Sequence, residues 1–202
     1  MAVQPQISAG RIHIDLLRHG ETLAGSVYLG RTDVALSERG YRQMAEALLD
    51  APCYCSVVSS PLARCAAFAQ DYAQRHGLPL QYDARFQEMD FGAWDGRSAA
   101  EIAAADPGAL EHFWRDPVAF PPPQAEPLLS FQARVLAAWR ELPARYPSQR
   151  VLLITHGGVM RIILCHLQQR PLGELLSLSV PHAALHQITM GHESQQTVQV
   201  PA

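Results

Sequence analysis

The stretch Leu16–Thr22, LLRHGET, closes the first apolar run of the chain, which begins at Ile12. A short apolar run that ends at a glycine is typical of a buried strand that turns into a loop. The stretch therefore places the guanidinium of Arg18 and the imidazole of His19 at the carboxyl end of a strand. In open α/β sheets, ligands bind at that edge. We expect a polar site there, with Gly20 allowing another part of the backbone to approach closely.

Strand-like and helix-like segments alternate along the rest of the chain. This alternation predicts an α/β fold with a mostly parallel central sheet and helices on both faces. Ser37 is the expected N-cap of the first helix, and Gly77 is expected to end the second. The expected strands are about 12–17, 56–59, 80–82, 150–155, 184–190 and 197–200, and the expected helices are about 38–49, 61–75, 98–106, 109–115, 129–145 and 157–168.

The length of 202 residues, of which 48% are hydrophobic, suffices for one full core. We expect a single domain, residues 1–202, with a small helical cap inserted on the substrate side at about 98–127. Within this insertion, residues 117–127 contain five prolines and are expected to be irregular.

Composition excludes several classes of function. The net charge is −3 and the sixteen basic residues are scattered, which argues against nucleic-acid binding. The first residues lack the apolar core of a signal peptide and no apolar run could span a membrane, so we expect a cytoplasmic protein. The four cysteines lack zinc-site spacing, and the absence of lysine excludes a P-loop or Schiff-base lysine.

Two further strand ends carry polar side chains. The strand that ends at Ser59 is followed within about one helical turn by Arg64, and the most apolar strand is followed directly by His156. The carboxyl ends of parallel strands meet at one edge, so these residues are expected to converge with Arg18 and His19. The sequence therefore predicts an anion site that contains a nucleophile.

The residue types indicate phosphoryl chemistry. Arginine presents a planar fork of donors that matches phosphate oxygens and stays charged. A neutral imidazole whose other nitrogen is fixed by a main-chain carbonyl can attack phosphorus. A carboxyl must then protonate the departing oxygen, and the candidates are Glu88 and Asp90, because an incoming dianion favours the protonated form of a nearby carboxyl.

Five segments, in this order and spacing, resemble the histidine phosphatase superfamily, which has the phosphoglycerate-mutase-like fold. They are LLRHGET (16–22), GRTDVALSERG (30–40), VVSSPLARC (57–65), FQEMDFGAWDG (86–96) and LLITHGGVMRIIL (152–164). The resemblance implies His19 as the phosphorylated nucleophile and Glu88 as the proton donor. The residues implied around the phosphoryl group and the substrate are Arg18, Arg64, His156, Thr22 and Gly157. It also implies no metal, no organic cofactor and a small phosphomonoester as the binding partner.

The chain departs from the family pattern at two places. Members often carry an asparagine shortly after the first histidine motif, whereas this chain has Gly25 there and no asparagine anywhere. We expect that contact to be lost or supplied by a backbone amide. Many members also have a Gly-Glu-Ser run before the helix expected at 129–145, where residues 124–127 read QAEP.

Other polar and aromatic residues have simpler interpretations. His182 and His186 have a spacing typical of metal ligands, but no Glu or Cys accompanies them, so structural roles are favoured. Asp90 is expected to cap a turn. On spacing alone Arg64 could be a surface arginine, and His19 and His156 could be core histidines. The aromatic residues expected to pack in the core or the cap are Phe91, Trp94, Phe113 and Trp114.

Within the family, a phosphatase is favoured over a mutase, because only 23 residues separate Arg64 from Glu88. Residues 16–40 are most similar to the alpha-ribazole phosphatases, which remove a 5'-phosphate in cobalamin biosynthesis. The alternatives are a broad-specificity sugar or nucleotide phosphatase, a phosphoglycerate mutase, a non-catalytic phosphate-binding regulatory module and, least favoured, a metal hydrolase. Either a monomer or a homodimer fits the sequence.

Overall fold

The computed structural model describes residues 11–190 and the strand 196–199. These residues form one six-stranded sheet with the order β3-β2-β4-β1-β5-β6. The strands are β1 (Ile12–Arg18), β2 (Ser56–Ser59), β3 (Leu80–Tyr82), β4 (Arg150–Thr155), β5 (Leu185–Met190) and β6 (Gln196–Gln199). The α/β fold predicted from the alternating segments is confirmed.

Strand direction changes at one edge of the sheet. The neighbours β3, β2, β4 and β1 are parallel, whereas β5 and β6 add to β1 as antiparallel strands. The chain returns to the carboxyl edge before β5 starts, because Leu185 pairs with Leu17 near the carboxyl end of β1, and β5 therefore runs back along β1. The last strand was expected at 197–200, and Val200 lies outside the described residues.

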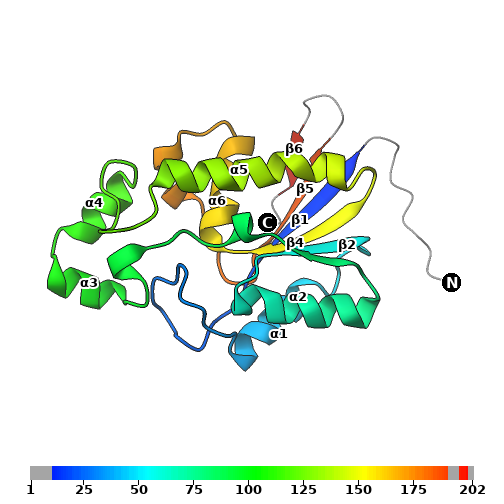
Figure 1. The fold of residues 1–202 in the computed structure, drawn as a ribbon, viewed down its shortest axis with the longest axis horizontal. Coiled ribbons are helices and arrows are strands. Elements are labelled where there is room, and N and C mark those ends of the chain that lie inside the picture. Colours follow the sequence, from blue (N-terminus) through cyan, green and yellow to red (C-terminus); the bar gives the residue numbers. More distant parts are fainter. Residues whose placement is uncertain (1–10, 191–195, 200–202) are drawn as a thin grey trace.

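Helices cover both faces of the sheet (Figure 1). One face packs against α1 (Glu38–Ala47) and α2 (Ala63–His76), and the other against α5 (Leu128–Arg145) and α6 (Gly157–Leu167). The short helices α3 (Ala99–Ala105) and α4 (Ala109–Arg115) lie beyond the carboxyl edge. Three 3₁₀ helices, which the sequence analysis did not predict, are η1 (Ala84–Phe86), η2 (Gly92–Trp94) and η3 (Leu172–Ser177).

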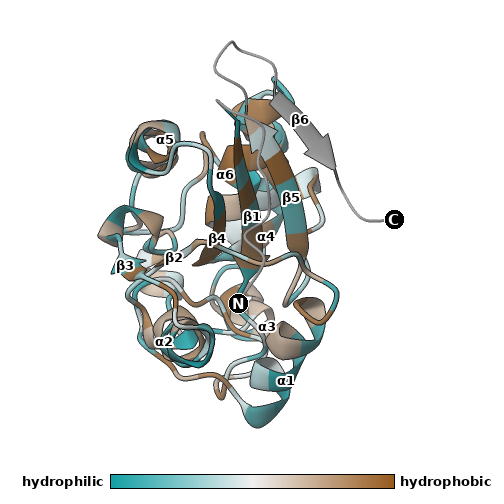
Figure 2. Cartoon of the chain, turned by 90° about the vertical axis from the view of Figure 1, so that its right-hand side faces the viewer, coloured by the Kyte–Doolittle hydropathy of each residue, from teal (hydrophilic) through white to brown (hydrophobic). Residues whose placement is uncertain are grey.

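Alternation along the strands produces the two-sided core, because successive side chains of a strand point to opposite faces. Leu16 and Leu153 belong to the cluster that contains α5 and α6. Their neighbours Leu17 and Ile154 belong to the cluster under α1 and α2. All four side chains are fully buried, and Figure 2 shows the hydrophobic β1 and β4 between the two helix layers. This burial fixes the central strands and therefore the position of their carboxyl ends.

Two helix-end predictions are confirmed. The Ser37 side chain accepts a 3.0 Å hydrogen bond from the Gly40 amide at the start of α1. Gly77 ends α2 in the left-handed conformation, with φ of 64°. α2 begins at Ala63, two residues after the predicted Pro61, since the Ser60 hydroxyl accepts the Leu62 amide before the first helical turn.

The region 98–127 has a small core of its own. Its two helices are joined by a short turn, and residues 117–127 form turns without helix or strand, as predicted from the prolines. A separate hydrophobic cluster beneath it contains Trp94, Ile102, Leu110 and Phe113. Across the described residues, no helix is long and apolar enough to cross a membrane.

Candidate active site

A cavity of about 910 Å³ lies at the carboxyl ends of β1 and β4, at the start of α6. Its walls come from these strand ends, the loop after β1, the 98–127 region and η3. The predicted site residues in its lining are Arg18, His19, Thr22, Glu88 and Gly157. Residues far apart in the sequence therefore meet where the strand-end argument expected them.

His19 is held as a neutral imidazole with one nitrogen occupied. Its Nδ1 lies 2.8 Å from the Gly20 carbonyl oxygen, which can only accept, so Nδ1 carries the hydrogen and Nε2 has the lone pair. Burial and the neighbouring Arg18 lower the pKa of His19 well below its ordinary value. A side chain at Gly20 would collide with α1, because its Cβ would lie 2.1 Å from the Gly40 carbonyl oxygen.

Arg18 has a buried donor without a partner. One guanidinium nitrogen, Nη1, donates to the Val180 carbonyl at 2.6 Å. Its Nε is buried and has no hydrogen-bond partner within the described part of the chain. Burial lowers the pKa of Arg18 to about 10, against the opposing effect of Glu88. A buried, unsatisfied and charged donor is costly, so its place in the cavity wall fits an anionic ligand.

The Gly157-Gly158 pair makes room for charged groups at the start of α6. A Cβ at Gly157 would lie 3.2 Å from Arg18 Nε and 3.0 Å from Arg161 Nη1. A Cβ at Gly158 would lie 2.2 Å from Glu88 Oε1. Two guanidiniums and one carboxylate therefore converge over these glycines.

Glu88 is fixed by backbone amides on both sides. Its Oε2 accepts from the Gly158 amide at 2.9 Å, and its Oε1 accepts from its neighbour Met89 at 3.1 Å. Arg134 donates to the Glu88 carbonyl at 2.9 Å and forms a two-point ion pair with Glu126 at 2.7 and 2.8 Å. Glu126, in the segment that departs from the family pattern, thus positions Arg134, which in turn holds the backbone of Glu88.

Asp90 performs the turn-capping role predicted for it. Its Oδ1 accepts from the Gly92 amide at 2.9 Å, and it forms a 3.5 Å ion pair with Arg31. Asp90 is absent from the cavity lining.

Arg64 and His156 form a second layer behind His19. Arg64 is fully buried, so it is no surface arginine. Its Nε lies 3.3 Å from His156 Nδ1, and its Nη atoms donate to the carbonyls of Leu29, Gly30 and Thr32. These bonds engage four of the five N–H donors of a guanidinium, so at most one donor and the positive charge remain for a ligand.

His156 is neutral and oriented by the same network. Because Arg64 donates to Nδ1, the hydrogen of His156 is on Nε2, which donates to the Ser60 hydroxyl at 2.7 Å. Burial and Arg64 lower the pKa of His156 well below its ordinary value. Its ring packs edge-on against His19, with centroids 5.2 Å apart.

Among the cavity residues that sequence reasoning did not place in the site are Arg161 and His182. Arg161 lies about one helical turn after Gly157, and its Nε donates to the Leu178 carbonyl at 2.9 Å. The signal was available, because Arg64 has a similar position after β2. The His182 ring centroid lies 5.7 Å from that of His19. The sequence analysis favoured a structural role for His182, because no Glu or Cys accompanies its four-residue spacing from His186.

The charge at the end of the cavity that contains Arg18 and His19 suits a dianion. Arg18, Arg64 and Arg161 with Glu88 give three positive charges and one negative charge, a balance of +2. The other cavity carboxylate, Glu174, is paired with Arg170 at 2.9 Å. Over the residues that the structure describes, no group of three or more His, Cys, Asp or Glu is arranged to hold a metal ion.

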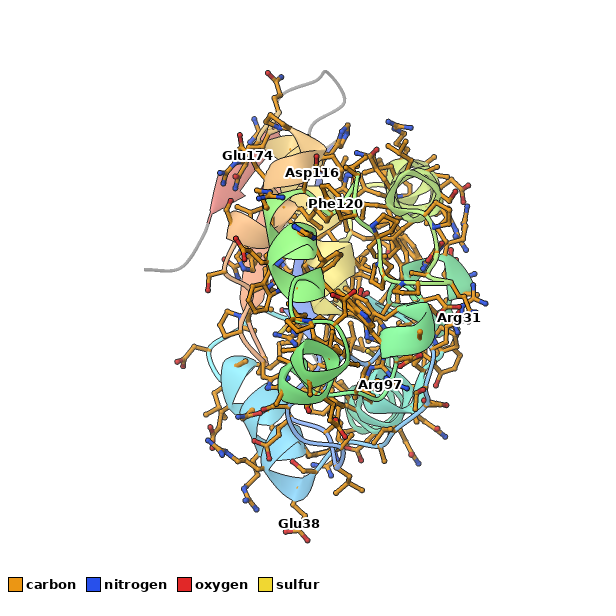
Figure 3. All side chains as sticks on the ribbon, turned by 90° about the vertical axis from the view of Figure 1, so that its left-hand side faces the viewer. Arg31, Glu38, Arg97, Asp116, Phe120 and Glu174 are labelled. Atoms are coloured by element: carbon orange, nitrogen blue, oxygen red, sulfur yellow. The ribbon has the colours of Figure 1, made fainter. Side chains whose placement is uncertain are left out.

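The opposite end of the cavity is aromatic and aliphatic. Trp114 on α4 donates through Nε1 to the Tyr28 hydroxyl at 3.1 Å, which joins the cap to the loop after β1. Figure 3 looks from the side of α3 and α4, with Asp116 and Phe120 labelled in the segment that follows α4. The apolar side chains here include Val27, Tyr28, Leu29, Phe91, Phe113, Trp114, Leu175 and Leu176. Phe91, Phe113 and Trp114, which were expected only to pack, therefore also face the cavity.

Gly25 lies at the margin of this cavity in the left-handed region, with φ of 69°. A Cβ added there would meet no atom within 4 Å. The place where family members often carry asparagine is therefore open.

A model of the histidine phosphatase superfamily (branch 1) matches residues 14–201. The chain belongs to the histidine phosphatase superfamily. Among curated members, it is 32% identical over 168 residues to glucosyl-3-phosphoglycerate phosphatase of Mycobacterium tuberculosis, covering 77% of this chain and 75% of that protein. It is 33% identical over 154 residues to a bifunctional protein of the same organism, but spans only 42% of that protein's length.

Solved structures of family members have the same fold. YhfR of Bacillus stearothermophilus superposes with a TM-score of 0.85 at 27% identity, covering 94% of this chain and 96% of that one. The alpha-ribazole phosphatase of Shigella flexneri superposes with a TM-score of 0.80 at 25% identity, covering 93% and 95%. The family and its phosphatase-named members support a phosphatase.

Proposed function

We propose that this chain is a metal-independent phosphomonoesterase that works through a phosphohistidine at His19. The observation that carries the proposal is the pairing of a neutral His19, whose Nδ1 is tied to Gly20, with the unpartnered Nε of Arg18 in one cavity wall. A nucleophile and an anion-binding donor thus lie side by side. A module that only bound phosphate would need neither a free imidazole lone pair nor a fixed carboxyl beside it.

In the first step, His19 Nε2 attacks phosphorus and the bond between phosphorus and the ester oxygen breaks. Arg18 and Arg161 neutralise the phosphoryl oxygens as charge moves onto them. Glu88, protonated in the presence of the dianion, gives its proton to the departing oxygen. The products are an alcohol and phosphorylated His19.

In the second step, water attacks the phosphohistidine. Glu88, now a carboxylate, takes one proton from that water, and the bond between Nε2 and phosphorus breaks. Inorganic phosphate leaves, and His19 returns to its neutral form.

Arg64 and His156 support both steps from behind. Their mutual hydrogen bond and the Ser60 contact fix the ring that packs against His19. Arg64 adds positive charge next to the phosphoryl group and keeps at most one donor for it. Thr22 and Gly157 complete the wall on the substrate side.

For the substrate, we propose a phosphate ester of an uncharged alcohol that carries an aromatic ring, such as alpha-ribazole 5'-phosphate. The apolar end of the cavity, with Tyr28, Phe91, Phe113 and Trp114, supports a flat apolar group better than a charged one. The resemblance of residues 16–40 to the alpha-ribazole phosphatases supports the same choice. Under this proposal the chain acts in cobalamin biosynthesis in the cytoplasm, as one domain with residues 98–127 as its substrate-side cap.

The test is a phosphatase screen with EDTA present throughout. It compares alpha-ribazole 5'-phosphate with phosphoserine, glucosyl-3-phosphoglycerate, sugar phosphates and 3-phosphoglycerate. We expect turnover without metal and the highest kcat/KM for the ribazole ester. Comparable turnover of many unrelated esters would replace the specific assignment by a broad-specificity phosphatase, and transfer between the glycerate positions would indicate a mutase. Activity lost in EDTA and restored by a divalent ion would refute the metal-free mechanism.

A further inference from the structure

His182 stands beside the nucleophile without a bonding partner of its own. It lines the cavity together with Arg18, His19 and Thr22, and its ring is tilted by 42° to that of His19. Neither of its ring nitrogens has a hydrogen-bond partner among the described residues, and the side chain is exposed. A core histidine would instead be buried and satisfied.

The backbone around His182 is hydrogen-bonded to the carboxyl end of β1 and to the residue that follows it. The Arg18 guanidinium donates to the Val180 carbonyl at 2.6 Å, and the Ala183 amide donates to the His19 carbonyl at 3.3 Å. Ala183 has φ of 57°, in the left-handed region that residues with a Cβ seldom adopt. An unfavourable conformation that persists between two such contacts indicates a turn held in place by its surroundings.

Charge around His182 favours a neutral ring that still has one N–H to donate. Although the residue is exposed, the partial burial of its ring and the charge of Arg18 lower the pKa of His182, while Glu21 acts in the opposite direction. A neutral imidazole adds a directional donor to the site without adding to the repulsion among its guanidiniums.

We propose that His182 is a phosphoryl-binding residue, whose imidazole N–H donates to an oxygen of the phosphoryl group held between Arg18 and His19. This side chain, rather than a backbone amide, then supplies a phosphoryl contact in a chain that has Gly25 where family members often carry asparagine. The inference deepens the proposed function, because it adds a residue to the same site.

The experiment measures binding of inorganic phosphate by calorimetry, which needs no turnover. The proteins are the wild type, His182→Ala, His182→Asn and the control His166→Ala, which removes a partly buried imidazole that is absent from the cavity lining. We expect His182→Ala to weaken phosphate binding about tenfold, the effect of losing one hydrogen bond to a charged group. His182→Asn keeps an N–H donor and should recover most of the affinity, and the control should match the wild type.

A second readout uses p-nitrophenyl phosphate, for which KM should rise in His182→Ala while the thermal unfolding midpoint stays constant. Phosphate affinity within twofold of wild type in His182→Ala would overturn the proposal, as would an equal loss in the Asn variant and in the control. If the wild type turned over no ester but phosphate binding still depended on His182, the proposed function would fail and the assignment of His182 would stand.

Discussion

The two ends of the cavity are built from different kinds of structure. At the phosphate end, Arg18, His19 and His156 stand at strand ends, with their orientations fixed by buried or partly buried hydrogen bonds. At the leaving-group end, the walls come from a loop, a 3₁₀ helix and α4, and Trp114 is 53% exposed. The first end depends on the sheet itself, and the second on segments that can change without disturbing it. The sheet therefore positions the groups proposed for the chemistry, whereas the segments around it are expected to determine substrate choice.

The largest effect is expected at the phosphate end. His19→Ala removes the nucleophile and with it the covalent route, so activity should fall below about 10⁻⁴ of the wild type. Phosphate that is labile in acid and stable in base should be trapped on His19 of the native protein after a rapid quench. The circular dichroism spectrum of the variant should stay native, which separates lost chemistry from lost folding. Label found on a serine would contradict the mechanism.

Glu88→Gln tests the acid between the two ends. With an alkyl ester, loss of the proton donor should slow turnover about 10²–10⁴-fold. With p-nitrophenyl phosphate, whose leaving group needs no proton, the defect in kcat/KM should shrink markedly, because kcat/KM reports the first step and not the later attack of water. Steady-state kinetics of one variant on two substrates measures both effects.

Asp90→Asn is the matched control, since that carboxylate caps a turn and pairs with Arg31 outside the cavity. It should lower stability more than activity. A defect in Asp90→Asn that depends on the leaving group, together with none in Glu88→Gln, would show that Asp90, and not Glu88, is the proton donor.

The sequence allowed the convergence of strand ends at the phosphate end to be predicted, but not Arg161 or His182. Periodicity located β1, β2 and β4, and the rule that parallel strand ends meet brought Arg18, Arg64 and His156 to one edge. The hydrogen-bond partners of these three side chains could not be predicted. The carbonyls that engage Arg64 belong to a loop without periodicity, so its position behind His19, outside the cavity wall, became visible only in three dimensions.

The leaving-group end was largely beyond prediction. The 3₁₀ helix Leu172–Ser177 is too short to give a periodic signal, yet it contributes Leu175 and Leu176 to the cavity. At the phosphate end, His182 was missed because its orientation depends on the turn at Ala183, whose positive φ occurs without a glycine in the sequence.

A smaller effect is expected when pH changes the charge of the buried histidines. Folding lowers the pKa of His19 and of His156, so as pH falls below about 6.5 the unfolded chain takes up protons that the native protein does not. Their contribution to stability is complete above that pH and is lost progressively below it. We expect the free energy of unfolding in urea to drop by more than about 1 kcal/mol between pH 7.5 and 5.5. Burial raises the pKa of Asp15, which works in the opposite direction.

His156→Gln tests how much of this pH dependence comes from the imidazole of His156. The variant should be less stable at pH 7.5, because the contact with Arg64 is altered, but its stability should fall less steeply toward pH 5.5. A stability that is constant or rises from pH 7.5 to 5.5 in the wild type would contradict the neutral state assigned to both rings.

The smallest effect is expected at the leaving-group end, and it distinguishes the two ends most directly. Trp114→Ala removes one aromatic wall and the hydrogen bond to Tyr28. It should reduce kcat/KM for an aromatic ester by up to about tenfold, the range of a single aromatic contact, and change that for glycerol phosphate less than about twofold. The control is Phe120→Ala, another exposed aromatic residue near α4 that does not line the cavity. Equal losses on both esters would show that Trp114 supports the phosphate end as well, and the division between a fixed chemical end and a variable specificity end would then be wrong.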